Sequence, residues 1–209
     1  MDIESMSATG LAAVLALVAG RRGHFELESG HHGGLWLDLD PLFVDPARIA
    51  PFVERLASAL APHEPEVVCG PLLGGAFLAQ LVARELRVAF AFTERHLPSG
   101  SGGLYRAAYR LPAALAPQVR RRRVAIVDDV MSAGSAARGT YTALESHGAT
   151  TVAVGAILVL GDAGASWFAE RGIAVESCAR DAYELWEPAA CPRCAEGMPL
   201  ERMSIPAQA

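Results

Sequence analysis

Short apolar segments alternate with longer, helix-like segments from residue 66 to residue 177. The apolar segments, which we interpret as strands, cover residues 66–69, 88–92, 123–127, 151–160 and 173–177, with a further candidate at 104–111. Helices are predicted between them at residues 76–86, 135–147 and 166–171. Alternation of this kind is typical of βαβ units, which build a parallel sheet with right-handed crossovers. The sequence therefore predicts an α/β fold in which helices flank a parallel core sheet.

The rest of the chain is less regular. A helix is predicted at residues 7–19, a loop or irregular strand at 21–32, and a strand at 35–39. Asp45-Pro46 predicts a helix that runs to about Leu60, because Asp is a good N-cap and Pro suits the first turn. We expect a single domain over residues 1–209, with its core at about 45–180 and an irregular, proline-containing C-terminal tail.

Charge and hydropathy exclude two classes of partner. The net charge is −5, and all 18 basic residues are arginines. General nucleic-acid binding depends on an excess of basic groups, so none is expected. No apolar run approaches the ~20 residues that a membrane span requires. We therefore expect a cytoplasmic protein that binds neither nucleic acid nor membrane.

The most informative motif follows the strand at residues 123–127. Two acids, Asp128 and Asp129, are followed by a turn of small residues from Ser132 to Ser135, and then by a helix. Backbone N–H groups at a helix N-terminus bind phosphate, and Gly134 leaves room for it. Two carboxylates would repel that phosphate unless they serve another group, such as ribose hydroxyls or a divalent cation that these hydroxyls bridge.

This pattern predicts a cradle for ribose 5-phosphate. It is neither a P-loop, which requires Gly-Lys-Ser/Thr, nor the Gly-x-Gly-x-x-Gly dinucleotide fingerprint. Two adjacent acids alone are more often a helix cap, so the prediction depends on the whole pattern.

The segment from Asp128 to Ala136 resembles the 5-phosphoribosyl-1-pyrophosphate (PRPP) motif of type I phosphoribosyltransferases, in the form found in orotate phosphoribosyltransferases. Residues 23–30 are similar to the N-terminal stretch that forms part of a hood over the base in that family. Residues 70–75, Gly-Pro-Leu-Leu-Gly-Gly, resemble its pyrophosphate loop. Cys191-Pro-Arg-Cys194, with the Gly, Pro and Leu that follow it, resembles the tail of some bacterial members.

The resemblance implies a Rossmann-like parallel core sheet of five strands, a small hood from residues of about 20–40 and the tail, and a homodimer. It also implies an enzyme that transfers phosphoribose from PRPP to a nucleobase with Mg²⁺, orotate being the first candidate. The residues that it implies for PRPP are Asp128 and Asp129 on the ribose hydroxyls, Val130, Met131, Ser132, Ala133, Gly134 and Ser135 on the 5′-phosphate, and Leu72, Leu73 and Gly74 on the pyrophosphate. A strained peptide is common in the pyrophosphate loop of the family, and Phe25 and Ser29 of the hood are candidates for base contacts.

A mobile loop is needed over the reacting carbon, because its oxocarbenium-like state is short-lived in water. Residues 93–103, rich in Gly and Ser, are the candidate lid. It carries Arg95 and His96 where orotate enzymes have lysines, and we expect these two to act in catalysis beside Asp128 and Asp129. The alternative is a solvated loop with incidental charges.

The base is less well specified than the sugar phosphate. In orotate enzymes an arginine that holds the orotate carboxylate follows the strand matching residues 152–160, but here Gly161-Asp162 follows it. Glu28 also stands where some members have a basic residue. Another base, or a regulator that binds PRPP without turnover, stays open, and a base pocket without an arginine would count against orotate.

Two groups of potential metal ligands have no assigned role, and we assign no resident metal ion. Cys191 and Cys194 have metal-ligand spacing, but zinc needs four ligands, so Cys178, His147 or a second chain would have to contribute. Tail packing and redox chemistry are the alternatives. The histidines of the hood stretch, at positions 24, 31 and 32, are expected to be polar hood residues or substrate contacts, and would bind a metal only with a further partner.

Overall fold

The computed structural model describes residue 12, residues 14–98 and residues 103–202, and within them it contains two sheets. The core sheet has the strand order β5-β4-β3-β6-β7-β8. Its strands are β3 (Val67–Pro71), β4 (Ala89–His96), β5 (Ala108–Arg110), β6 (Arg123–Met131), β7 (Thr150–Leu160) and β8 (Ala174–Asp181). All neighbours pair in parallel except β4 and β5. The predicted core of five parallel strands is confirmed, with β5 as an antiparallel addition at one edge.

Each central strand is buried on both faces. In β6, Val124 and Ile126 join one apolar cluster, whereas Ala125 and Val127 join the other. Alternate residues of a strand point to opposite faces, so apolar residues at every position require a cover on each side.

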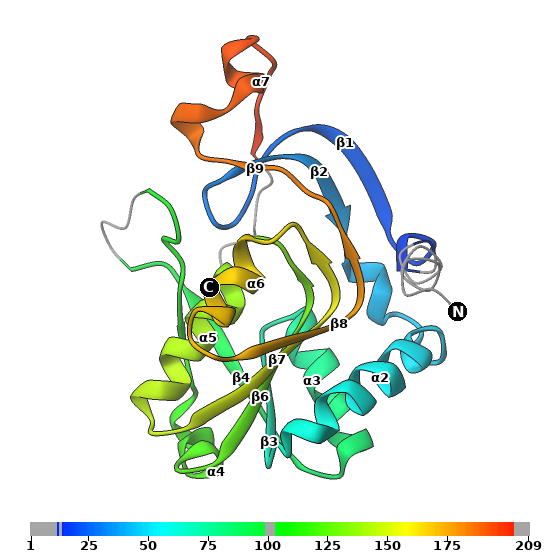
Figure 1. Ribbon diagram of the computed structural model, residues 1–209, viewed down its shortest axis with the longest axis vertical. Helices are drawn as coiled ribbons and strands as arrows, with labels where there is room; N and C mark the ends of the chain where they lie inside the picture. Colours follow the sequence, from blue (N-terminus) through cyan, green and yellow to red (C-terminus); the bar gives the residue numbers. More distant parts are fainter. Residues whose placement is uncertain (1–11, 13, 99–102, 203–209) are drawn as a thin grey trace.

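Helices supply both covers (Figure 1). The helices are α2 (Pro46–Leu60), α3 (Gly74–Leu86), α4 (Ala116–Val119), α5 (Ser135–Ser146), α6 (Ala163–Ala169) and α7 (Pro192–Ala195), with short 3₁₀ helices η1 (Asp40–Phe43), η2 (Ala61–His63), η3 (Ala113–Leu115) and η4 (Pro188–Ala190). Helices α2 and α3 pack on one face of the core sheet, and α4, α5 and α6 pack on the other. The predicted start of α2 is confirmed, because Asp45 accepts a hydrogen bond from the N–H of Ala47. None of the described helices is long and apolar enough to cross a bilayer.

The second sheet forms the hood above the core (Figure 1). Its strand order is β10-β1-β2-β9, made of β1 (Ala19–Glu26), β2 (His32–Asp38), β9 (Leu185–Trp186) and β10 (Glu201–Arg202). A register shift between Arg22 and Phe25 makes β1 irregular, as predicted. We expected an irregular tail, but two of its segments, β9 and β10, complete this sheet on either side of the β1–β2 hairpin.

Several predicted boundaries were wrong, and one cause explains most of them. Strand β4 continues to His96 and β6 to Met131, although polar residues there suggested loop and turn. The neighbouring strands pair with these residues, which keeps them in extended conformation. Val130, for example, pairs with Leu158 of β7. The helix predicted at residues 7–19 lies partly outside the described residues, and its described part gives way to strand β1 at Ala19.

Candidate active site

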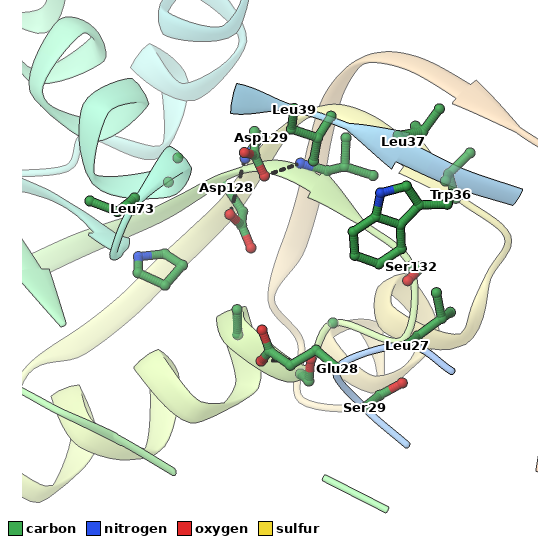
Figure 2. Close-up of a pocket in the computed structure, with 18 of the residues that line it drawn as sticks. Leu27, Glu28, Ser29, Trp36, Leu37, Leu39, Leu73, Asp128, Asp129 and Ser132 are labelled. Carbon is green, nitrogen blue, oxygen red and sulfur yellow. Dashed lines mark hydrogen bonds between the residues drawn. The ribbon is translucent and has the colours of Figure 1, made fainter. Parts of the chain in front are cut away.

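A pocket of about 290 Å³ lies between the carboxyl ends of β3 and β6 and the hood. Ligands of parallel sheets bind at this end of the strands, and the volume lies close to the lower end of the range for small-molecule sites, about 300 Å³. The core contributes Pro71, Leu72, Leu73, Gly74, Gly75, Tyr109, Asp128, Asp129, Val130, Ser132, Gly134, Ser135, Ala136 and Leu160. The hood and the segments beside it contribute Leu27, Glu28, Ser29, Leu35, Trp36, Leu37, Leu39 and Tyr183. Figure 2 shows the two aspartates between Leu73 of the core and Trp36 and Leu37 of the hood.

The acid pair lies at the carboxyl end of β6 and is held by the backbone. Asp128 accepts a hydrogen bond from the N–H of Asp129 at 3.1 Å, and Asp129 accepts one from Val130 at 2.7 Å. Burial raises the pKa of Asp128 well above its usual range, and the charges of Asp129 and Glu28 raise it further. Burial also raises the pKa of Asp129. Hydrogen bonds from ligand hydroxyl groups would stabilise the charged form of these poorly solvated acids.

The turn after β6 presents backbone donors to the same pocket. Gly134 has a φ of +75°, and α5 begins at the next residue with no side chain capping its N-terminus. The first N–H groups of a helix have no partner within it, so those at the start of α5 are free to bind an anion. A Cβ on Gly134 would lie 3.2 Å from the Cα of Gly164, so a larger residue would strain both the backbone and this contact.

The loop between β3 and α3 forms the opposite side of the pocket. The peptide bond between Leu72 and Leu73 is cis, and the N–H of Leu72 donates to the carbonyl of Thr93 at 2.9 Å. A Cβ on Gly74, the first residue of α3, would overlap the Asp129 carboxylate. The lack of a side chain at Gly74 therefore lets the loop approach the acid pair closely.

Glu28 connects the hood to the start of α5, directly after the turn that follows β6. Its carboxylate accepts hydrogen bonds from the Tyr109 hydroxyl at 2.8 Å and the Ser135 hydroxyl at 3.3 Å. The Nε atom of Arg95 lies 3.8 Å from the same carboxylate. A negative group thus occupies the position beside the N-terminus of α5 that favours anions.

Comparison with known proteins agrees with this geometry. The family described as phosphoribosyl transferase domain matches residues 47–188. The chain belongs to the phosphoribosyltransferase family. An orotate phosphoribosyltransferase of Thermotoga maritima is 31% identical over 180 residues, which cover 86% of this chain and 89% of that relative. This phosphoribosyltransferase also resembles solved structures in fold.

Two of these structures are transferases named for different bases. An orotate phosphoribosyltransferase from Aeropyrum pernix has a TM-score of 0.63 at 19% identity, covering 84% of this chain and 93% of that chain. An adenine phosphoribosyltransferase from Thermoanaerobacter pseudethanolicus has a TM-score of 0.63 at 17% identity, covering 82% and 99%. The shared fold therefore does not discriminate between bases.

Most residues predicted to bind PRPP lie in this one pocket. Those that line it are Leu72, Leu73, Gly74, Asp128, Asp129, Val130, Ser132, Gly134 and Ser135. Met131 and Ala133 do not line it: Met131 is the last residue of β6, Ala133 lies in the turn that follows, and both are buried. The loop and turn, which are far apart in sequence, are brought together by the parallel pairing of β3 with β6.

The other predicted site residues lie elsewhere or only beside the pocket. Ser29 lines it, but Phe25 is fully buried within the hood and packs against Trp36. Arg95 reaches the pocket only through Glu28, and His96 is exposed at the end of β4. Residues 93–96 of the predicted lid belong to β4, and residues 99–102 lie outside the described part.

Sequence reasoning missed the wall that faces the acid pair. Leu35, Trp36, Leu37 and Leu39 of the hood, with Leu160 at the end of β7, form an apolar surface. Among the residues described, no arginine lines this pocket.

One arginine lies close by. Arg138 lines an adjoining hollow, which shares Tyr109 and Ser135 with the pocket, and its guanidinium lies over the Tyr105 ring at 4.5 Å. The alternating pattern of the strand predicted at 35–39 was the available signal for the wall, but nothing in it indicated which face would meet a ligand.

Proposed function

We propose that this pocket binds PRPP and transfers its phosphoribosyl group to a nucleobase, with release of pyrophosphate, and that orotate is the first acceptor to test. The observation that carries the proposal is the meeting of three features in one pocket. These are an acid pair, an uncapped helix N-terminus and a close-approaching backbone loop. Each suits one part of PRPP.

The three features divide the substrate between them. The start of α5 and the Ser135 hydroxyl suit the 5′-phosphate, because both offer N–H or O–H donors. Asp128 and Asp129 suit the two ribose hydroxyls as acceptors. The backbone of residues 72–74 suits the pyrophosphate, because backbone N–H groups bind phosphates and Gly74 carries no side chain at the start of α3.

These residues also fit Mg²⁺ bound together with PRPP. The ion prefers oxygen ligands and often binds through substrate phosphates, keeping several waters. Asp128 and Asp129 offer carboxylate oxygens next to the ribose position. When bound, the ion supplies positive charge that stabilises the departing pyrophosphate.

Bond breaking places negative charge on pyrophosphate and positive charge on the sugar carbon. Arg95 lies beside the pocket, next to Glu28, and we propose that it contributes to neutralising the pyrophosphate. His96, exposed at the end of β4, is proposed for the same role.

Orotate is favoured by the curated relatives, since the orotate phosphoribosyltransferase of Thermotoga maritima covers most of the chain. A second candidate, transfer to an uncharged base, is favoured by the pocket itself. Its wall is apolar, and none of the described residues lining it is basic. An anionic base without a cationic partner would lose a charge-assisted hydrogen bond, which is about twice as strong as a neutral one.

A base panel tests both candidates. The purified protein is incubated with PRPP, Mg²⁺ and, separately, orotate, uracil, adenine, guanine or hypoxanthine, and pyrophosphate release and product mass are measured. Turnover of orotate alone supports the first candidate, and turnover of an uncharged base supports the second. PRPP binding without release from any base would point to a regulator and overturn the enzymatic proposal.

Paired variants connect the activity to the acid pair. Asp129→Asn should abolish most turnover, whereas Asp181→Asn should leave it unchanged, because Asp181 is an exposed acid at the end of β8 that does not line the pocket. Equal activity in both variants would contradict the proposed ribose site. The proposal also includes a homodimer, which light scattering during size-exclusion chromatography tests directly.

A further inference from the structure

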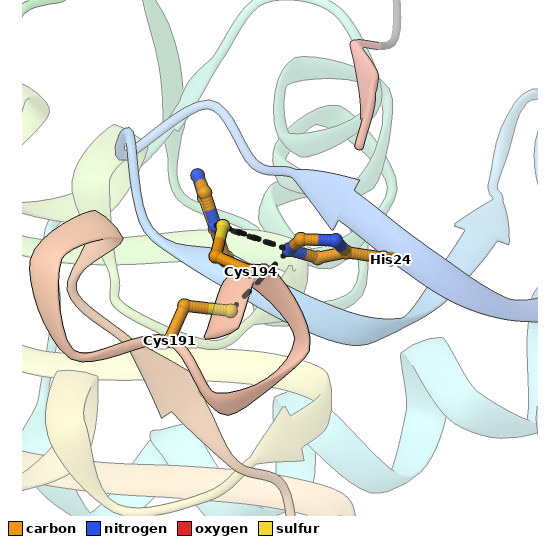
Figure 3. A group of neighbouring side chains, drawn as sticks. His24, Cys191 and Cys194 are labelled. Carbon is orange, nitrogen blue, oxygen red and sulfur yellow. Dashed lines mark hydrogen bonds between the residues drawn. The ribbon is translucent and has the colours of Figure 1, made fainter. Parts of the chain in front are cut away.

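Four potential metal ligands meet at the outer edge of the hood, away from the PRPP pocket. His24 comes from β1, His32 from β2, and Cys191 and Cys194 lie at the start and within the short helix α7. One ligand atom from each residue lies within 4.8 Å of every other. Figure 3 shows the two cysteine sulfurs directed at the His24 ring. We propose that these residues bind one structural Zn²⁺ ion, independently of the proposed enzymatic function.

The distances match a tetrahedral zinc site. With Zn–N of about 2.0–2.1 Å and Zn–S of about 2.3 Å, a tetrahedron separates two nitrogens by about 3.3 Å and a nitrogen from a sulfur by about 3.6 Å. The Nε2 atom of His24 lies 3.1 Å from Nδ1 of His32, 3.3 Å from Sγ of Cys191 and 3.7 Å from Sγ of Cys194. The Nδ1 atom of His32 lies 3.4 Å from Sγ of Cys194.

The surroundings fix one histidine in the form that binds a metal. The Nδ1 atom of His24 lies 3.0 Å from the backbone carbonyl of Met198, so the ring donates its proton there. The lone pair of Nε2 then faces the two sulfurs. A second hydrogen bond of this kind is the usual support of a zinc-binding histidine, because it sets both tautomer and ring orientation.

Burial and charge also favour the ion. His24, His32 and Cys191 are buried, and only Cys194 is exposed. Two thiolates and two neutral imidazoles balance the charge of Zn²⁺, and a closed set of four protein ligands is the form of a structural site.

The ion would connect the tail to the hood. Strands β9 and β10, which bring the tail to the hairpin, are two residues long each, and so short a pairing is weak on its own. The hairpin in turn carries Glu28, Ser29 and the apolar wall of the pocket. Zinc binding contributes directly to folding free energy where a site forms only in the folded chain. We therefore expect the ion to hold the hood in the shape that closes the pocket.

The first experiment measures metal in the intact protein, purified without a polyhistidine tag and without chelator. Inductively coupled plasma mass spectrometry is expected to find about one zinc per chain. Replacement by Co²⁺ should give the intense visible absorption of a tetrahedral site, with a thiolate charge-transfer band. No bound metal after incubation with Zn²⁺ alone, a stoichiometric metal other than zinc, or a Cys191–Cys194 disulfide would overturn the proposal.

Matched cysteine variants locate the ion. Cys194→Ser, which changes an exposed residue, should lose the zinc and the cobalt spectrum, whereas Cys178→Ser should keep both. Cys178 is buried against α2, where its thiol donates to the Phe52 carbonyl, a bond that serine can also make. Retention of zinc in Cys194→Ser, or equal loss in both variants, would contradict the assignment.

Hydrogen exchange tests the structural role without relying on activity. Removal of zinc by a chelator should increase exchange in residues 19–38 and 185–202, while β3 and β6 of the core stay protected. Unchanged exchange in the hood after metal loss would mean that the ion does not hold it, and would overturn the structural part of the proposal.

Discussion

Gly74 offers a sharp test of how the proposed pyrophosphate loop and the acid pair cooperate. Its Cα lies so close to Asp129 that an added Cβ would overlap one carboxylate oxygen and lie 2.9 Å from its Cγ. The backbone of Gly74 is outside the left-handed region, so alanine is compatible with its conformation. Gly74→Ala should therefore displace the Asp129 side chain without disturbing the start of α3.

The size of the effect follows from the interaction that is lost. A hydrogen bond to a charged group contributes about 1.5–3 kcal/mol. If Asp129 holds a ribose hydroxyl, its displacement should weaken PRPP binding about 10- to 150-fold, since about 1.4 kcal/mol corresponds to a factor of ten. Alanine is a better helix former than glycine by up to about 1 kcal/mol, so the melting temperature should change little.

Isothermal titration calorimetry with PRPP and Mg²⁺ measures this effect, and a double-mutant cycle isolates its cause. Asp129→Ala removes the carboxylate that the new methyl group would strike, so Gly74→Ala should cost almost nothing further in that background. Additive losses in the double variant would refute the reasoning, because they would mean that Gly74 acts on the ligand and not through Asp129. Full PRPP affinity in Gly74→Ala would refute it as well.

Three further changes test the electrostatics and packing around the pocket. Burial raises the pKa of Asp128, so the folded protein binds a proton on this carboxyl group more tightly than the unfolded chain does. The stability that this proton contributes declines as pH rises from about 3.9 through the raised pKa. Asp128→Asn should therefore raise the melting temperature of the ligand-free protein at pH 7, while weakening PRPP binding in calorimetry. Glu28→Gln removes a negative charge beside the α5 N-terminus and releases Arg95, so steady-state kinetics should give a lower KM for PRPP, and a higher KM would contradict the assigned phosphate position. Phe168→Ala should lower the free energy of unfolding by about 3–5 kcal/mol in urea titrations, because the ring is fully buried, whereas the half-exposed Phe77 should tolerate the same change far better.

The core and the pocket that we propose for PRPP were predictable because their signals are local. An apolar strand, two acids and a turn of small residues lie in one continuous segment from Val124 to Ser135, and each part has a direct physical meaning. Parallel pairing then places this segment beside the loop at residues 70–75. The polar residues at the ends of β4 and β6 were assigned to loops, because only the neighbouring strands stabilise them as extended chain.

The hood and its tail were not predictable in the same way. Strand β10 pairs Phe25 with Glu201, and no pattern within either short segment indicates this partner. The two cysteines and the two histidines of the proposed zinc site were each noticed in the sequence. Their ligand sets stayed incomplete because the segments are about 160 residues apart, and only the folded hood brings them together.

This difference explains why the sequence specified the sugar phosphate better than the base. The proposed phosphate and pyrophosphate positions are surrounded largely by backbone groups, which leave a signature of glycine and small residues wherever they occur. The proposed base position lies against ordinary apolar side chains of the hood, among them Trp36 and Leu37, and such side chains are indistinguishable in sequence from core. Since the proposed zinc ion joins this hood to the tail, the shape of the base wall depends on contacts between distant segments. We therefore expect base preference to depend on the shape of the hood, about which local sequence patterns carry the least information.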